Sequence, residues 1–581
     1  MKGARRTLSE RGKLLLLSLL VGLGSGFAAV LLEKGITLIQ GFVFPVINKG
    51  GFSALAVALP AAGMLLSLLI TRFAVRDNIS HGVTKVLVAV SRNESRIKPH
   101  NMWSSLVTSA LTIGLGGSVG AEAPIVYTGA AIGSNLGRAF RLSYRGITVL
   151  LGCGAAGAIA GIFKAPLAGI LFTLEILLFN MSIANMMPLL ISVLTATVVS
   201  YLFTGPVTPF SCTLAPFNFG NMPFYLVLGI FCGLCSLYFT RTTLWLEDRF
   251  ARLRSPWVRW VAGAAGVGLC ILFFPPLFGE GYNFLGALLN GESWHFDGES
   301  PLAGMLRSAW GVPLFVLMVM LFKVVSMTLT NSGGGVGGTF GPTLFVGGLA
   351  GFVVARTLSI AGLPLPEQNF VLVGMAGLMA GVMQAPMTAI FLIAEITGGY
   401  DLLLPLILCS AVSFGVTRIR EKYSIYTKRI AQSGELLTHD NDQAVLTLLD
   451  PRQLVSDKYP RIPVGSTLGD ILQTVADSAV AVFPVLAPDG TLAGVLEMDE
   501  IRKYMPYPER AVGVMVKDIM QAPPEVVREG ENMDSVMRKF DSTDAWRLPV
   551  LDAGGRYLGL ISRSRILKAY REELRQISSE D

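Results

Sequence analysis

The feature that most constrains this chain is a glycine- and proline-rich frame that occurs twice, 218 residues apart. The first copy surrounds Glu122 and the second surrounds Phe340, so only one copy carries a charge. The frame consists of Gly117, Gly120, Pro124, Gly129 and Gly133 in the first copy, and of Gly335, Gly338, Pro342, Gly347 and Gly351 in the second. A further pair of blocks, which end at Glu175 and Glu395, repeats at an offset of 220. Blocks that keep their spacing indicate two homologous halves.

Composition places these halves in a membrane. The 581 residues are 52% hydrophobic and 15% charged, with a mean hydropathy of +0.57, which is far too apolar for a soluble protein of this size. We expect a polytopic α-helical membrane part over residues 1–432, with inverted halves at about 10–210 and 220–430. The windows long enough to cross a bilayer of about 30 Å include Leu14–Phe42, Ala54–Ile70, Met187–Phe203, Phe224–Phe239, Val258–Phe274 and Val312–Leu329.

Charge at the ends of the membrane part predicts its orientation. Basic residues precede the first apolar run and follow the last, so the positive-inside rule places both termini in the cytoplasm, most simply of a plasma (inner) membrane. These residues are Lys2, Arg5, Arg6, Arg11, Lys13, Arg418, Arg420, Lys422, Lys428 and Arg429. Such loops and lipid headgroups explain the net charge of +7, and no basic patch interleaved with aromatic residues indicates a nucleic-acid partner.

Cysteine usage indicates neither disulfides nor a metal site. Most of the six cysteines lie in apolar helices, where a thiol behaves as a small hydrophobic group. Cys232 and Cys235 have CxxC spacing but lie in a membrane helix without partner ligands.

The repeated frame predicts an anion site. Short helices should begin after Gly120 and after Gly338, with their first N–H groups unpaired by the helix itself. Helix N-termini carry partial positive charge and bind anions. Two such termini, one from each half, form a site that we expect to contain no Lys or Arg, because a full charge would hold the anion too tightly for rapid release.

Several motifs resemble those of CLC chloride channels and proton/chloride exchangers. Gly120–Pro124 resembles the GxExP motif of that family, and Gly338–Pro342 resembles its GxFxP motif. Ala165–Glu175 resembles the next helix, and Tyr426 resembles the pore-lining tyrosine. The resemblance covers the whole membrane part and implies a homodimer in which each subunit has its own chloride pathway.

The resemblance also implies which residues bind and gate the anion. Glu122 would be the gate, whose ionised side chain competes with chloride and moves away when protonated. The anion-binding residues would be Ser80, His81, Gly82, Gly120, Ala121, Glu122, Thr339, Phe340, Gly341 and Tyr426. The family's usual serine falls on His81, or on Ser80 if the register slips by one. His81 could therefore donate a ring N–H to chloride, gate on protonation, or be satisfied by backbone at a helix start.

A second departure concerns proton coupling. Exchangers of the family usually have an internal glutamate where this chain has Ile176, directly after Glu175. Isoleucine cannot relay a proton, which favours a gated passive channel over an exchanger with a proton route through water or another group. Glu175 and Glu395 lie at equivalent helix ends in the two halves, so we expect both to be structural.

The C-terminal part has a different composition. Residues 433–451 are predicted to be a polar linker, and residues 452–510 and 511–581 alternate short Val/Leu strands with amphipathic helices. Both segments resemble CBS motifs, which together imply a cytoplasmic α/β Bateman pair.

Such pairs often bind adenine nucleotides through a G-x-x-[ST]-x-x-D ending. Here the candidate nucleotide contacts are Gly494 in the first copy and Gly559 and Ser562 in the second. Neither copy completes the motif, since Arg565 stands at the Asp position of the second. The pair is therefore expected to bind an adenine nucleotide or to stabilise the dimer, and no cofactor is required for transport.

Two readings from other classes compete with anion transport. An intramembrane serine protease would need His81 as its base, but the chain has no Gly-x-Ser-x-Gly elbow with partners. A CBS-regulated divalent-cation channel would need clustered membrane carboxylates, whereas Glu122, Glu175 and Glu395 are scattered.

Overall fold

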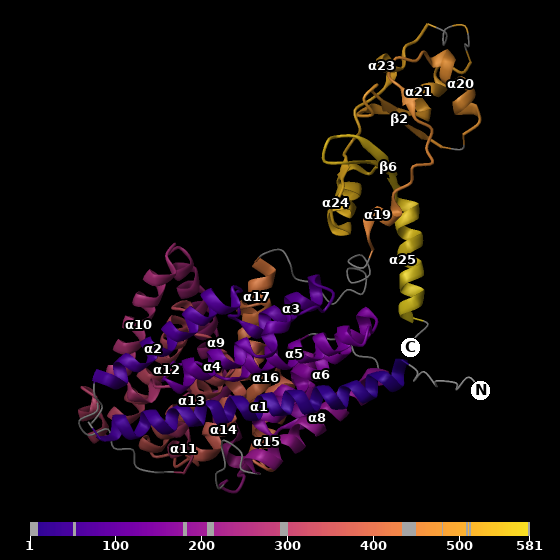
Figure 1. Ribbon diagram of the computed structural model, residues 1–581. Helices are drawn as coiled ribbons and strands as arrows, with labels where there is room; N and C mark the ends of the chain where they lie inside the picture. The colour runs from indigo at the N-terminus through magenta and orange to yellow at the C-terminus, as the bar shows by residue number, and fades with distance from the viewer. Residues whose placement is uncertain are drawn as a thin grey trace. The chain divides into compact units, whose positions relative to one another are not determined.

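The computed structural model describes residues 10–49, 54–177, 183–205, 214–290, 300–432, 449–478, 480–506, 509 and 513–578. The chain separates into two compact units, Met1–Leu436 and Leu437–Asp581. Figure 1 shows the first unit as a bundle of helices and the second as small sheets flanked by helices. Most of the predicted linker, 433–448, lies outside the described residues.

The first unit contains two comparable series of helices. The first half contains α1 (Glu10–Lys49), α2 (Ala54–Leu69), the π-helix η1 (Ile70–Val75), α3 (Gly82–Arg92), α4 (Ser104–Gly114), α5 (Glu122–Ala139), α6 (Tyr144–Phe163), α7 (Pro166–Glu175) and α8 (Ile183–Thr204). The second half contains α9 (Met222–Ala251), α10 (Pro256–Phe273), α11 (Tyr282–Asn290), α12 (Gly311–Ser332), α13 (Phe340–Ile360), α14 (Glu367–Met383), α15 (Pro386–Ile396) and α16 (Leu403–Arg420). It is followed by α17 (Ile425–Gln432). Among the described residues, nine helices are long and apolar enough to cross a membrane.

Repeated glycines bring helix backbones into contact in the same way in both halves. α5 packs on α6, and α13 packs on α14. A side chain on Gly129 would overlap the carbonyl oxygen of Gly154, and one on Gly347 would lie 2.5 Å from the carbonyl oxygen of Gly374. Small residues allow this close approach between membrane helices. The spacing conserved within the sequence therefore corresponds to one packing unit built twice.

The ends of these helices also match between the halves. The residues that directly follow α6 and α14, Lys164 and Gln384, are both in the left-handed conformation, with φ angles of 57° and 53°. A proline then opens the next helix in each half, at Pro166 and Pro386. Proline suits the first helical position because the N–H that it lacks has no intrahelical acceptor there.

The two short helices that follow exchange carboxylate caps. α7 packs against α15. Glu395, near the end of α15, accepts two successive backbone N–H groups at the start of α7, each at 2.9 Å. Glu175, at the end of α7, accepts two N–H groups at the start of α15, at 3.0 and 2.6 Å, and the hydroxyl of Thr388 at 2.7 Å. Both glutamates thus have the structural role that their positions predicted, since each neutralises a helix N-terminus of the other half.

The second unit contains two three-stranded sheets of the same topology. In each sheet the first strand is parallel to the second, which is antiparallel to the third. The elements are α19 (Pro451–Leu454), β1 (Ile462–Pro463), α20 (Leu468–Ala476), β2 (Val482–Leu486), β3 (Leu492–Glu497), α21 (Met498–Arg502), α23 (Val516–Ile519), β4 (Val527–Arg528), α24 (Met533–Thr543), β5 (Arg547–Leu551), β6 (Tyr557–Ser562) and α25 (Arg563–Ser578). The identical strand order indicates two copies of one α/β motif.

The described cysteines are buried and unpaired. They are Cys153, Cys232, Cys235, Cys270 and Cys409. Cys212 lies outside the described residues.

Candidate functional site

The two glycine frames meet backbone to backbone. The N–H of Gly120 donates to the carbonyl oxygen of Gly338 at 3.1 Å, and the N–H of Gly338 donates to the carbonyl oxygen of Gly120 at 2.7 Å. Two residues later α5 begins at Glu122 and α13 begins at Phe340. Both helices therefore start from one point, as the repeat predicts, although they span 18 and 21 residues and are not short.

The carboxylate of Glu122 lies at the N-terminus of the opposite helix. Its Oε2 accepts the backbone N–H of Gly341 at 3.1 Å, and its Oε1 accepts the hydroxyl of Tyr282 at 2.6 Å. The side chain is only 2% exposed. An acidic group is thus held, away from bulk water, at a position where a helix N-terminus would bind an anion.

Glycine is required on both sides of this carboxylate. A side chain on Gly341 would lie 2.9 Å from Oε1 of Glu122 and 2.7 Å from the hydroxyl oxygen of Tyr282. A side chain on Gly120 would overlap Oε2 of Glu122. The frame therefore leaves space for an acceptor the size of a carboxylate oxygen next to the N–H of Gly341.

The remaining candidates from the second half surround the first residues of α13. The hydroxyl of Thr339 donates to the hydroxyl oxygen of Tyr426 at 3.2 Å, and Tyr426 is 3% exposed. The ring of Phe340 packs against Phe163 and Phe172, with centroids 5.4 and 6.2 Å away. Residues 339–341 and Tyr426 are thus brought together around the helix end that binds Glu122.

The first-half candidates Ser80, His81 and Gly82 lie at the start of α3. His81 is the residue before that helix, with φ at 58°, and its side chain makes no capping hydrogen bond. Its Nε2 lies 3.9 Å from Oε1 of Glu247, which also forms an ion pair with Arg429. A side chain on Gly82 would lie 2.9 Å from Cβ of Tyr127 on α5. The loop is thus packed against the helix that begins at Glu122, and the His81 ring faces an ion pair rather than backbone.

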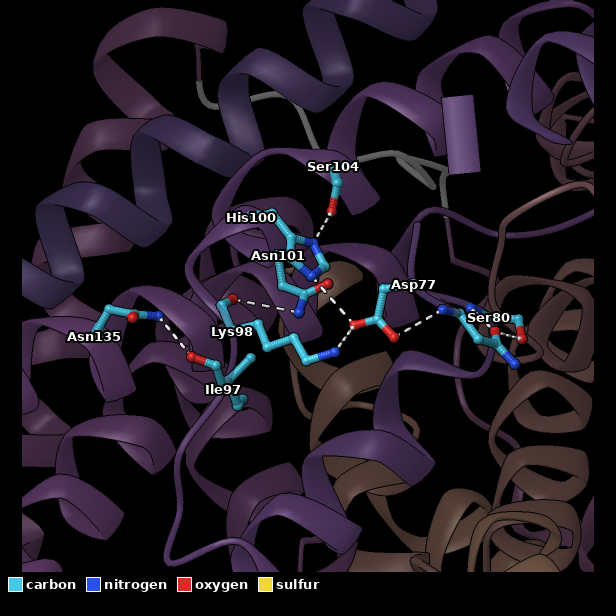
Figure 2. A network of polar contacts seen from close by, with 9 residues as sticks. Asp77, Ser80, Ile97, Lys98, His100, Asn101, Ser104 and Asn135 are labelled. Atoms are coloured by element: carbon cyan, nitrogen blue, oxygen red, sulfur yellow. Dashed lines mark hydrogen bonds and ion pairs between the residues drawn. The ribbon is translucent and has the colours of Figure 1, made fainter. Parts of the chain in front are cut away.

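Figure 2 shows what holds this loop. The carboxylate of Asp77 lies between the side chains of Lys98 and His100, at 3.0 and 3.2 Å. Burial alone would raise the pKa of Asp77, but the hydrogen bond and charge of Lys98 lower it by a larger amount. The pKa of this carboxyl is therefore below its usual range. The hydroxyl of Ser80 donates to the side-chain oxygen of Asn78 at 2.6 Å. The hydroxyl of Ser80 therefore donates its hydrogen bond within the loop.

The same network contains a Ser–His–Asp arrangement. Nδ1 of His100 lies 3.2 Å from the hydroxyl of Ser104, while Nε2 faces Asp77. Ser104 is completely buried at the start of α4, so no substrate carbonyl can reach its hydroxyl. The arrangement fixes a linker and offers no nucleophile to an intramembrane protease.

A buried lysine lies against the frame, which corrects the expected absence of a fixed cation. Lys323 on α12 is completely buried, and its ammonium donates to the hydroxyl of Ser118 at 2.9 Å. It also donates to the backbone oxygens of Gly279 and Glu280, at 2.8 and 3.0 Å. The cation is tolerated because three oxygens satisfy its three N–H groups. A full positive charge therefore stands beside the motif that contains Glu122.

The position of the missing internal glutamate is apolar and buried. Ile176 follows α7 directly and is 3% exposed. No proton can be held on its side chain.

Comparison with known proteins agrees with this architecture. The family described as "Voltage gated chloride channel" matches residues 62–418, and the "CBS domain" family matches residues 516–572. The chain belongs to the voltage gated chloride channel (CLC) family. The H(+)/Cl(−) exchange transporter ClcA of Salmonella arizonae is 30% identical over 431 residues, covering 69% of this chain and 86% of that protein. The chloride channel protein CLC-f of Arabidopsis thaliana is 24% identical over 557 residues, covering 85% of this chain and 69% of that protein.

The fold of the membrane part has a solved counterpart. The crystal structure of a slow cyanobacterial Cl−/H+ antiporter superimposes with a TM-score of 0.63 at 22% identity, covering 74% of this chain and 99% of that chain. The protein is therefore an integral membrane protein with the CLC fold and a C-terminal CBS domain. Anion transport is the activity that its family membership supports.

Sequence reasoning missed four residues of this CLC site. Glu280 lies in the loop before α11 and Tyr282 is the first residue of that helix, both outside the repeated frame, and Glu247 lies in a long apolar helix. Lys323 gave a detectable signal, because it is the single charge within the apolar window 312–329. An isolated ionisable residue in a membrane segment generally marks a functional or paired site.

In the CBS unit, a cavity of about 220 Å³ lies beside the second sheet. It is lined by Pro451, Arg452, Val455, Val527, Arg528, Glu529, Gly530, Val550, Leu558 and Ile561. The sequence candidates do not line it. Gly559 and Gly494 are needed because backbone passes close by, at 2.5 Å from Ser456 and 2.8 Å from Gln521 for an added side chain.

Proposed function

We propose that this protein is a gated passive chloride channel in which Glu122 is the gate. The observation that carries the proposal is the hydrogen bond between the Glu122 carboxylate and the N–H of Gly341. The ionised side chain occupies the place that the helix N-terminus offers to an anion. Chloride can bind there only when the carboxylate leaves.

Protonation would open the gate. A neutral carboxyl group loses most of its attraction to the N-terminus of α13 and to the nearby ammonium of Lys323. Chloride then takes the N–H of Gly341, and the adjoining position is bordered by residues 339–341 and the hydroxyl of Tyr426. We also propose Ser80, His81, Gly82, Gly120 and Ala121 as lining residues of the pathway.

The passive mode rests on Ile176, which offers no internal proton acceptor. A proton/chloride exchanger is the second candidate, since several relatives carry that name. The pair His81 and Glu247 supports it, because these titratable side chains lie 3.9 Å apart beside α17, which also carries Tyr426. In that case the proton route would pass along the anion pathway itself.

Chloride efflux from proteoliposomes tests the gate. Wild-type flux should rise as the pH falls, and Glu122→Gln should give a high flux that depends little on pH, because the amide no longer competes as an anion. Glu94→Gln, which removes an exposed carboxylate paired with Arg96, serves as the matched control. An unchanged pH profile in Glu122→Gln would remove Glu122 from the gate.

We further propose a homodimer in the plasma (inner) membrane, with both termini and the CBS pair in the cytoplasm. The basic residues that flank the membrane part support this orientation. We retain the domain boundaries 1–432, 433–451, 452–510 and 511–581. The mass of the protein in lipid nanodiscs should be that of two chains, and a monomer mass would contradict the proposal.

The cavity beside the second sheet supports an adenine-nucleotide site. Its apolar walls suit a base, and Arg452 and Arg528 are close enough to meet phosphate groups. Transport itself requires no nucleotide in this proposal.

A further inference from the structure

A second carboxylate lies at the other helix N-terminus of the site. Oε1 of Glu280 accepts the backbone N–H of Ala121, the residue before α5, at 3.1 Å. The two helices that start at the Gly120–Gly338 bridge therefore each hold a carboxylate. The carboxylate of Glu122, a residue of α5, binds the first turn of α13. The carboxylate of Glu280 binds the N–H of the residue before α5.

We propose that Glu280 is a second gating residue, which competes with chloride at the N-terminus of α5 as Glu122 does at the N-terminus of α13. This inference rests on the gating role proposed for Glu122. An anion that passes between the two helix ends must then displace two carboxylates. The pathway is closed most tightly when both are in place.

Lys323 is the positioning residue of this second gate. Its buried ammonium holds the backbone oxygens of Gly279 and Glu280 and the hydroxyl of Ser118 at the same time. It thereby ties the loop that carries Glu280 to the motif that carries Glu122. The loop cannot move away from α5 without taking two of its three oxygen partners from a buried ammonium, which is costly in an apolar surrounding.

The charges of this cluster make the two gates interdependent. Glu122, Glu280 and Lys323 together carry one net negative charge when both carboxylates are ionised, and none when one is protonated. Glu33 on α1 adds a further negative charge that acts on Glu280, and the hydroxyl of Tyr282 donates to Glu122 at 2.6 Å. Protonation of one carboxylate therefore changes the charge that the other one faces.

The two gating candidates differ in exposure. Glu280 is partly exposed, whereas Glu122 is only 2% exposed. A residue that only capped α5 would need neither this partial exposure nor nearby charges such as those of Glu122 and Lys323.

The test compares chloride efflux from proteoliposomes for wild type, Glu280→Gln, Glu122→Gln and the double variant between pH 4.5 and 8, with Glu94→Gln as the control. We expect Glu280→Gln to raise flux at pH 7.5 about tenfold and to flatten the pH profile, since about tenfold is the loss from one charged hydrogen bond. The flux increase in the double variant should be smaller than the product of the increases in the two single variants, because the carboxylates act as a pair.

The outcomes separate the two proposals. If Glu122→Gln raises flux while Glu280→Gln keeps the wild-type flux and pH profile, the second gate is wrong and the first one stands. If Glu122→Gln has no effect, the proposed function itself fails. Glu280→Asp guards against misfolding, because its shorter carboxylate should give a flux between wild type and Glu280→Gln. Lowered thermal stability of both Glu280 variants with an unchanged pH profile would assign a structural role and overturn the inference.

Discussion

Removal of the Tyr282 hydroxyl is the cleanest perturbation of the gate. Tyr282→Phe keeps the ring and deletes only the donor that holds Oε1 of Glu122 at 2.6 Å. The other bond of the carboxylate, from the N–H of Gly341, remains. The variant therefore weakens the closed position without changing the shape of the pathway.

The size of the effect follows from that single bond. A hydrogen bond to a charged group contributes about 1.5–3 kcal/mol. At about 1.4 kcal/mol for each factor of ten, the closed state should lose about 10- to 100-fold in population relative to the open state. Because the hydroxyl stabilises the ionised carboxylate, its loss also makes protonation easier. The pH of half-maximal flux should therefore move upward by about 1–2 units.

Chloride efflux from proteoliposomes across a pH series measures both quantities. Tyr238→Phe is the matched control, since it removes a hydroxyl that donates to the backbone oxygen of Leu321 at 2.9 Å, in a different part of the same unit. Its pH profile should equal that of wild type. If Tyr282→Phe also keeps the wild-type profile, the hydroxyl does not hold the gate and the account of the closed state is incorrect.

Two further predictions concern stability and the CBS unit. Glu395→Gln should lower the unfolding free energy by about 1–2 kcal/mol through loss of a charged cap on α7, and Glu175→Gln should do the same for α15. Thermal unfolding in detergent measures this loss. The pH profile of flux should not change, and a shifted profile would show that these residues belong to the transport route. Calorimetry of the full-length protein should detect binding of ATP or AMP that is lost in Leu558→Trp, which fills the cavity, and an absence of heat with wild type would leave the CBS pair a purely structural module.

The sequence predicted the helices of the site well because a repeat reports packing directly. Glycine at positions 120 and 338 is needed where two backbones touch, and its recurrence at a constant offset predicted that the two helix N-termini meet at one site. The structural role of Glu175 and Glu395 was predicted for the same reason, although their exchange between the halves was not. Each half reproduces the same helix end, so the same carboxylate recurs.

The remaining half of the site could not be predicted from the repeat because it breaks the symmetry. Glu280, in the connection before α11, reaches Ala121, and Tyr282, at the start of α11, reaches Glu122; no spacing rule relates residues 280 and 282 to 121 and 122. Lys323 was visible as a single charge in an apolar window, but its partners are mainly backbone oxygens, which a sequence does not display. The physical argument against a cation assumed that it would bind the anion, whereas three protein oxygens already satisfy it.

The central claim is that Glu122 gates a passive chloride pathway with no internal proton acceptor at Ile176. Simultaneous recording of chloride flux and internal pH, in liposomes that hold a chloride gradient, tests it most directly. The account predicts that chloride runs down its gradient without stoichiometric proton movement, and that Glu122→Gln removes the pH dependence. Protons driven uphill by the chloride gradient would contradict it and identify the protein as an exchanger.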